Sequence, residues 1–181
     1  NFAGTVGVTI ERVTIENVYG DFLYFGSDRA NHRSWTRKVT VRDSTMRGSS
    51  RQGIAITGGS DIRIEGNTID GVGRSVFDVE PNAASGGAQR VLIAGNTVSR
   101  WQNALLPMAG RGRVTDIEIR ANTLVDQPIR VTVRALSVMR DGPRRVRIAI
   151  VDNRSTGTSG NPIAAVQDTD WLLVMGNVQA F

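Results

Sequence analysis

The stretch Ile62-Arg63-Ile64-Glu65-Gly66-Asn67-Thr68-Ile69 decides the fold of this 181-residue chain. Apolar and polar side chains alternate along its first half with a period of two, which is typical of a β-strand. An asparagine then stands where the strand must turn, since asparagine tolerates a left-handed backbone. Similar stretches around Val91 and Ile117 lie at intervals of about 20 to 50 residues, the self-similarity that marks a solenoid.

Seven copies of this pattern align along the chain. The first apolar position is Val8, Val39, Ile62, Val91, Ile117, Val146 and Leu172, and the second is Ile10, Val41, Ile64, Ile93, Ile119, Ile148 and Val174. The pattern predicts an all-β stack of about seven coils. We expect residues 1–181 to form one domain, a section of a longer chain that is incomplete or uncapped at one or both ends.

Asparagine recurs at one place in the repeat, at Asn67, Asn96, Asn122 and Asn177, with Ser44 at a fifth copy. Stacked about 4.8 Å apart, such side chains can bond one another along the axis of the solenoid. We therefore predict a structural asparagine ladder rather than a catalytic one. Val13 and Val151 interrupt it in this alignment.

A second, shorter strand is expected in most coils. We place it at residues 22–25, 53–57, 76–80, 104–108, 129–133 and 163–166, with Tyr24, Ala55 and Asp78 pointing outward. Longer connections follow at residues 27–37, 81–89 and 155–161. Insertions in solenoids collect in loops on one side, often the binding side.

These repeats resemble the right-handed parallel β-helix superfamily, which includes pectate lyases, polygalacturonases, alginate epimerases and phage tailspikes. The strings at residues 51–54, 62–69 and 77–82 are the closest to uncharacterised bacterial and phage β-helix repeat proteins. The resemblance covers nearly the whole chain. It implies a right-handed parallel β-helix, and it does not imply one activity, because function lies in sites carried by the fold.

The net charge of +5 comes almost entirely from arginine, since Lys38 is the only lysine. A basic surface can favour an anionic partner. Many arginines, however, fall where stacking predicts pairing: Glu11, Arg42 and Glu65 share one column, and Glu118 is expected beside Arg147. We therefore predict a partly paired solvated face and no nucleic-acid partner. No stretch is long and apolar enough for membrane insertion, and cysteine is absent.

Candidate catalytic residues are the carboxylates Asp21, Asp78 and Glu80, close to Arg51 and Gln52. Asp78 and Glu80 point to the same side of one strand, about 6.5 to 7 Å apart. Inverting glycosidases hold their two carboxyls about 6.5 to 9.5 Å apart, so this spacing permits an acid and base pair. The alternative is that these side chains are simply solvated or fix a turn.

Candidate substrate-binding residues lie beside them. Tyr24 and Trp35 offer faces on which sugar rings can stack, and Arg51 and Gln52 offer hydrogen-bond donors. His32, the only histidine, lies in the first long loop and is either a general acid or base or an exposed loop residue. No metal site and no cofactor are expected.

The sequence motifs of known enzymes of the superfamily are missing or incomplete in this chain. The strand positions where pectate lyases gather acidic residues for calcium carry a single acid here, Glu118, and calcium needs several oxygen ligands. The N-T-D, D-D and G-H-G strings of polygalacturonases are missing. Tyr19-Gly20-Asp21 is similar to the beginning of the alginate-epimerase Y-G-x-D-P string and departs from it at Phe22.

Two classes of function remain open from the sequence. One is an extracellular protein that recognises or processes a polysaccharide or cell-surface glycan, possible chemistry being hydrolysis or elimination. The other is a non-catalytic module of a phage tail or cell surface that binds a receptor or serves as a structural rod. Either would act outside the cell or on a virion, and a homotrimer of parallel rods is the assembly we expect if the protein self-associates.

Overall fold

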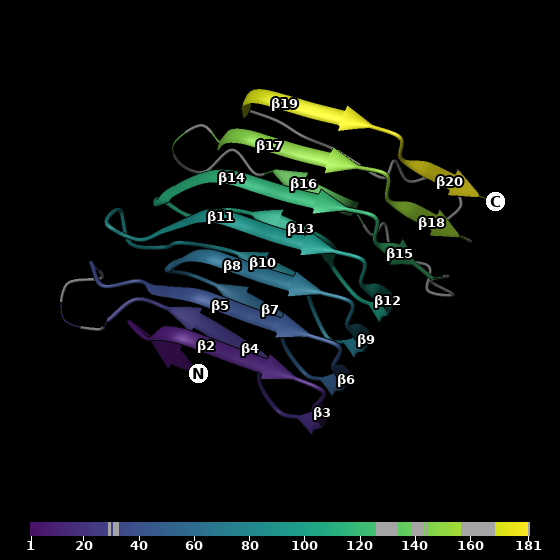
Figure 1. Cartoon of the computed structure of the whole chain (residues 1–181), viewed down its shortest axis with the longest axis horizontal. Helices are drawn as coiled ribbons and strands as arrows, with labels where there is room; N and C mark the ends of the chain where they lie inside the picture. Colours follow the sequence, from purple (N-terminus) through teal and green to yellow (C-terminus); the bar gives the residue numbers. More distant parts are fainter. Residues whose placement is uncertain are drawn as a thin grey trace.

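The computed structural model describes residues 1–28, 30, 33–125, 134–138, 143, 145–156 and 169–180, and for 134–138 and 179–180 the backbone alone. The chain winds as a β-solenoid whose strands stack along one axis, with the N-terminus at one end of the stack and the C-terminus at the other (Figure 1). All pairing between its strands is parallel. The all-β, parallel solenoid predicted from the repeat is confirmed.

Three parallel sheets form the sides of the solenoid, which we call sheets A, B and C. Sheet A contains β1 (Phe2–Ala3), β4 (Leu23–Gly26), β7 (Ile54–Ile56), β10 (Phe77–Val79), β13 (Ala104–Met108) and β16 (Arg134–Val138). Sheet B contains β2 (Val6–Glu11), β5 (Thr36–Arg42), β8 (Gly59–Glu65), β11 (Gly87–Ala94), β14 (Arg113–Arg120), β17 (Arg145–Val151) and β19 (Thr169–Met175). Sheet C contains β3 (Thr14–Val18), β6 (Thr45–Ser49), β9 (Thr68–Val72), β12 (Thr97–Trp101), β15 (Thr123–Leu124), β18 (Arg154–Thr156) and β20 (Val178–Ala180).

The number of coils differs slightly from the seven predicted. The described residues form about five complete turns, from β2 to β16, each with one strand in every sheet. β17 to β20 add strands to sheets B and C only. No helix in the described part of the chain is long and apolar enough to cross a membrane.

The interior is a continuous column of aliphatic side chains from all three sheets. The inward positions of sheets A and B are buried as expected, among them Phe25, Ile54, Ile56, Phe77, Val79, Val39, Val41, Ile62, Ile64, Val91, Ile93, Ile117 and Ile119. Sheet C adds Met46, Ile69, Val98 and Leu124. Such a core stabilises the coil by removing apolar surface from water, at about 25 cal/mol per Å².

The asparagine ladder is present and is longer than predicted. The backbone N–H and the side-chain Nδ2 of Asn67 both donate to Oδ1 of Asn96, at 2.9 and 3.0 Å. The same pair of bonds joins Asn96 to Asn122, Asn122 to Asn153, and Asn153 to Asn177. Each turn of the solenoid is thus fixed to the next at the corner between sheets B and C.

Asn153 was missed because the predicted register of the sixth copy is wrong by two residues. Ile148, not Val146, pairs with Ile117, which brings Asn153 rather than Val151 to the ladder position. The expected pairing of Glu118 with Arg147 is also wrong, since Glu118 pairs with Ala149. Arg147 instead binds Asp116, with 2.5 Å between Nε and Oδ1.

A column of residues with left-handed backbone runs down sheet B. Its non-glycine members, with φ between 52° and 62°, are Lys38, Asp61, Arg90, Asp116, Arg147 and Trp171. The strand pairing skips this column, and its first five members alternate in charge. Left-handed geometry costs a non-glycine residue about 1 to 2 kcal/mol. Ion pairs between neighbours, such as Arg90 with Asp61 at 2.6 Å, partly offset that cost.

Two further expectations need correction. The sequence predicted two strands per coil, whereas the structure has three, because the residue after each ladder position, most often a threonine, opens a short strand of sheet C. The last strand of sheet A is β16, at Arg134–Val138, and the predicted segments 129–133 and 163–166 lie outside the described residues. The other four predicted second strands are confirmed within one or two residues.

Candidate functional site

The outer face of sheet A positions the candidate residues. Tyr24 of β4 pairs in register with Ala55 of β7, and Ala55 with Asp78 of β10, so these three side chains form one outward row across adjacent turns. Neighbouring turns are about 4.8 Å apart. The predicted outward row is confirmed, and it places Tyr24 two turns from Asp78.

Unequal connections make this face concave. The connection from sheet A to sheet B is long in the first turn (residues 27–35), very short in the second (residues 57–58) and long again in the third (residues 80–86). The short connection therefore lies between two protruding loops. In the sequence this appears as the closest spacing of two anchors, Val39 and Ile62, between wider ones.

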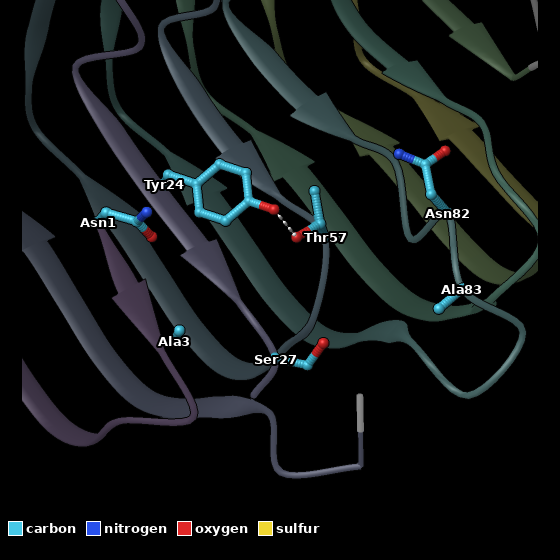
Figure 2. Close-up of a pocket in the computed structure, with 7 residues that line it drawn as sticks. All are labelled: Asn1, Ala3, Tyr24, Ser27, Thr57, Asn82 and Ala83. Carbon is cyan, nitrogen blue, oxygen red and sulfur yellow. Dashed lines mark hydrogen bonds between the residues drawn. The ribbon is translucent and has the colours of Figure 1, made fainter. Parts of the chain in front are cut away.

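A half-open pocket of about 520 Å³ occupies this hollow. Its lining residues are Asn1, Ala3, Tyr24, Ser27, Thr57, Asn82 and Ala83 (Figure 2). The Thr57 hydroxyl donates to the Tyr24 hydroxyl at 2.7 Å, which fixes the tyrosine ring over the floor of the pocket. Polar side chains around one ring face are suited to a ligand that is both polar and flat-sided, such as a sugar.

Of these lining residues, sequence reasoning found only Tyr24. Thr57, Asn1 and Asn82 were missed because none stands in a repeated position. Thr57 and Asn82 reach the pocket through the lengths of the connections, and Asn1 precedes β1. The variation in repeat length was the available signal. It pointed to loops 27–37 and 81–89, and both contribute to the pocket.

Asp78 lies on the same face and is unusual. It is only 7% exposed, and no hydrogen bond to its carboxyl is found among the described residues. Burial raises the pKa of Asp78 to about 6, and the nearby carboxylates of Glu80 and Asp21 raise it as well. Arg51 and Arg74 oppose this shift of the pKa. An acid with a pKa near neutrality can both release and accept a proton under mild conditions.

Glu80 follows β10 directly and connects Asp78 to the pocket. Its backbone N–H donates to the carbonyl of Ile56 at 3.1 Å, so it lies beside Thr57 of the preceding turn. Asp78 lies on β10 and Glu80 two residues later, just after the strand ends, and the charge of Glu80 raises the pKa of Asp78. The structure thus brings together the predicted pair of carboxylates.

Asp21 and Gln52 hold the corner between sheets C and A. Oδ1 of Asp21 accepts the backbone N–H of Gln52 at 3.0 Å, and Oε1 of Gln52 accepts the backbone N–H of Ser75 at 2.8 Å. Both side chains therefore bond the next turn in the manner of the asparagine ladder. Their contacts are structural, although Asp21 remains close enough to raise the pKa of Asp78.

The two arginines of this corner complete the charge pattern. Nε of Arg51 lies 3.8 Å from Oδ1 of Asp21, and the Arg51 side chain is half exposed. Arg74 occupies the equivalent place in the next turn, as the ladder from Asp21 through Gln52 to Ser75 shows, and it is exposed. Arg74 is not among the residues predicted from the sequence.

The indole of Trp35 forms a hydrogen bond within the protein. Its indole Nε1 donates to the carbonyl of Ser85 at 3.0 Å, so the first long loop contacts the third-turn loop. Trp101 is buried in the core and offers no face to a ligand. His32 lies outside the described residues. Within the described part of the chain, no group of three or more acidic, histidine or cysteine side chains is arranged to hold a metal ion.

The fold, the asparagine ladder and the row of outward residues define a class of protein, the parallel β-helices with a candidate site on one sheet. The family model described as "Right handed beta helix region" matches residues 1–177, and the chain belongs to this family. No curated protein matches the sequence significantly. The family assignment confirms the resemblance and leaves the activity to be argued from the site.

Proposed function

We propose that this protein binds a polysaccharide or cell-surface glycan on the outer face of sheet A and hydrolyses it, with Asp78 as the general acid and Glu80 as the partner carboxylate. The single observation that carries this proposal is the Asp78 carboxyl: buried, without a hydrogen bond in the described structure, and with a pKa raised to about 6. Such a carboxyl is costly to keep in a folded protein unless it has a use.

The proposed chemistry follows from the two environments. Asp78 holds a proton up to about pH 6 and donates it to the glycosidic oxygen of the leaving group. Glu80, which follows the end of β10 and is more exposed than Asp78, removes a proton from the attacking water. Their spacing along the strand, about 6.5 to 7 Å, leaves room for that water and favours inversion at the anomeric carbon. Tyr24, Thr57 and Asn82 would orient a sugar ring beside the pair.

A panel of immobilised polysaccharides, neutral and acidic, tests this proposal. We expect retention on at least one polysaccharide and release of soluble sugar at mildly acidic pH. Asp78→Asn and Glu80→Gln should each reduce release by about 10²-fold or more while retention persists. Asp61→Asn, which changes an aspartate on sheet B, is the matched control and should leave both unchanged. Retention by no polysaccharide would reject the proposal.

A non-catalytic binding module is the second candidate, acting at the surface of a cell or of a phage tail. It is favoured by the commitment of Asp21 to the backbone of Gln52, which leaves two free carboxylates rather than three. Retention without product release, unchanged by Asp78→Asn but weakened by Tyr24→Ala, would support this candidate. Both candidates place the protein outside the cell or on a virion.

A further inference from the structure

We propose that the pocket on sheet A is a blind site that takes the end of a glycan chain, so that the protein acts on chain termini and not within a polymer. This inference rests on the proposed glycan function and specifies which part of the glycan is bound. It comes from a contact between the two long loops, which close the pocket at the side facing sheet B.

The first loop presents Trp35 in a fixed position. Ser27 and Trp35 form an isolated antiparallel bridge. Inside it, the backbone N–H of Asp28 donates to the carbonyl of Ser34 at 3.0 Å, and Oδ2 of Asp28 accepts the N–H of Ser34 at 2.7 Å. The two ends of the loop are therefore joined, and the indole is held at its base.

Trp35 then reaches across the second turn to the third. Its Nε1 donates to the carbonyl of Ser85 at 3.0 Å. A Cβ atom on Gly87 would lie 2.4 Å from Cη2 of this indole, so the ring packs directly on the glycine. We call the contact of Trp35 with Ser85 and Gly87 the clasp. It spans the short connection at residues 57–58.

No passage remains beneath the clasp. A Cβ atom on Gly58 would lie 2.7 Å from the backbone nitrogen of Ser27, and one on Gly86 would lie 3.1 Å from the carbonyl oxygen of Thr57. Both long loops therefore touch the short connection. Together with the clasp they form a wall that a polysaccharide cannot cross.

The wall closes the side of the pocket facing sheet B, so we infer entry from the opposite side, along sheet A. Asn1 and Ala3 border the pocket on one side and Asn82 and Ala83 on the other (Figure 2). A ligand enters along the strands of sheet A, from the side of Asp21 and Asp78, and stops at the wall. A volume of about 520 Å³ suits a ligand of a few sugar rings and not a continuous polymer. The terminal sugars lie in the pocket, with the following linkage close to Asp78 and Glu80.

Linear oligosaccharides of increasing length, prepared by partial hydrolysis of the retained polysaccharide, test this inference. The Asp78→Asn variant keeps them intact during titration. We expect affinity per mole of chain to stop rising after two or three sugars. Methylating the terminal hydroxyls at one chain end, or reducing the other end with borohydride, should weaken binding at least about tenfold for one of the two treatments.

Affinity that keeps rising with chain length, and indifference to both end treatments, would overturn the chain-end site while leaving the glycan function intact. Retention of no polysaccharide would overturn both. Trp35→Phe keeps an aromatic ring but removes the donor to Ser85, so the wall should loosen. We expect this variant to bind end-blocked chains about tenfold more tightly than the parent protein does. Trp171→Phe, at an exposed tryptophan of β19, is the control and should restore none.

Discussion

Asn96 and Asn122 are joined by two hydrogen bonds to a single atom: Oδ1 of Asn122 accepts both the backbone N–H and the side-chain Nδ2 of Asn96, at 2.9 and 3.0 Å. Nδ2 of Asn96 also donates to the carbonyl of Ile64 in the turn below. Because Oδ1 of Asn96 also accepts the backbone N–H of Asn67, one side chain satisfies two buried backbone groups of the preceding turn and bonds the asparagine of the next. An aliphatic residue cannot replace it without leaving those groups unpaired.

Asn96→Leu is therefore expected to lower the free energy of unfolding by about 1 to 3 kcal/mol, the cost of buried polar groups left without partners. Urea denaturation followed by circular dichroism measures the loss. Asn177→Leu is the graded control: Asn177 is the last described member of the ladder and is partly exposed, so its loss should be smaller. Equal midpoints for Asn96→Leu and the parent protein would argue against a stabilising ladder.

Gly87→Ala tests the clasp through packing. Gly87 is not in the left-handed region, but an added Cβ would lie 2.4 Å from the Trp35 ring. The indole must move, and overpacking of this kind costs about 1 to 3 kcal/mol. We expect a lower melting temperature and a red-shifted tryptophan emission. Gly20→Ala is the matched control, since a Cβ there meets nothing within 4 Å, and unchanged emission in Gly87→Ala would show that the ring does not rest on the glycine.

The sequence allows the fold and part of the site to be predicted, and its limits have physical reasons. Period-two alternation with a recurring Asn-Thr identifies sheet B and the ladder, because every turn repeats the same contacts. The predicted register is wrong in the copy around Val146, Ile148 and Ile150. Apolar residues two apart allow two equivalent alignments there, and only the pairing of Ile148 with Ile117 in the structure distinguishes them. The prediction of the pocket is incomplete because Thr57 and Asn82 are brought together by loop length and not by a repeated residue.

Arg145 is the residue whose environment is most affected by this error in the predicted register. The predicted alignment of the sixth copy starts at Val146, whereas in the structure Arg145 is an inward residue only 1% exposed. Its guanidinium donates to the carbonyls of Gly110 and Gly112 at 3.1 and 3.2 Å, among others. Burial lowers the pKa of Arg145. The side chain thus organises the corner after β13.

Arg145→Met is expected to destabilise by about 1 to 3 kcal/mol, because the aliphatic part still fills the core while the carbonyls lose their donors. Arg145→Lys keeps one charged head but cannot reach several carbonyls in different directions, so it should recover only part of the loss. Urea midpoints of the two variants measure the effect. A gain in stability for Arg145→Met would mean that the desolvation of the guanidinium outweighs its hydrogen bonds.

Replacing Asp78 should raise the stability of the protein and abolish its activity. Its pKa in the folded protein is raised to about 6 from 3.8, so the folded state holds a proton that the unfolded state releases between these values. Stability is therefore highest below about pH 4 with respect to this group and falls as pH rises towards 6. Asp78→Asn removes the ionisation while keeping the shape of the side chain.

At pH 7 we expect Asp78→Asn to be more stable than the parent by about 1 to 2 kcal/mol, because each pKa unit corresponds to about 1.4 kcal/mol and residual solvent screens part of the shift. The difference should vanish below about pH 4, where the carboxyl is protonated in both states. Urea midpoints across pH measure it. Stabilisation combined with lost glycan hydrolysis would identify Asp78 as a residue retained for chemistry at a cost in stability, whereas destabilisation at pH 7 would show that its carboxylate supports the fold.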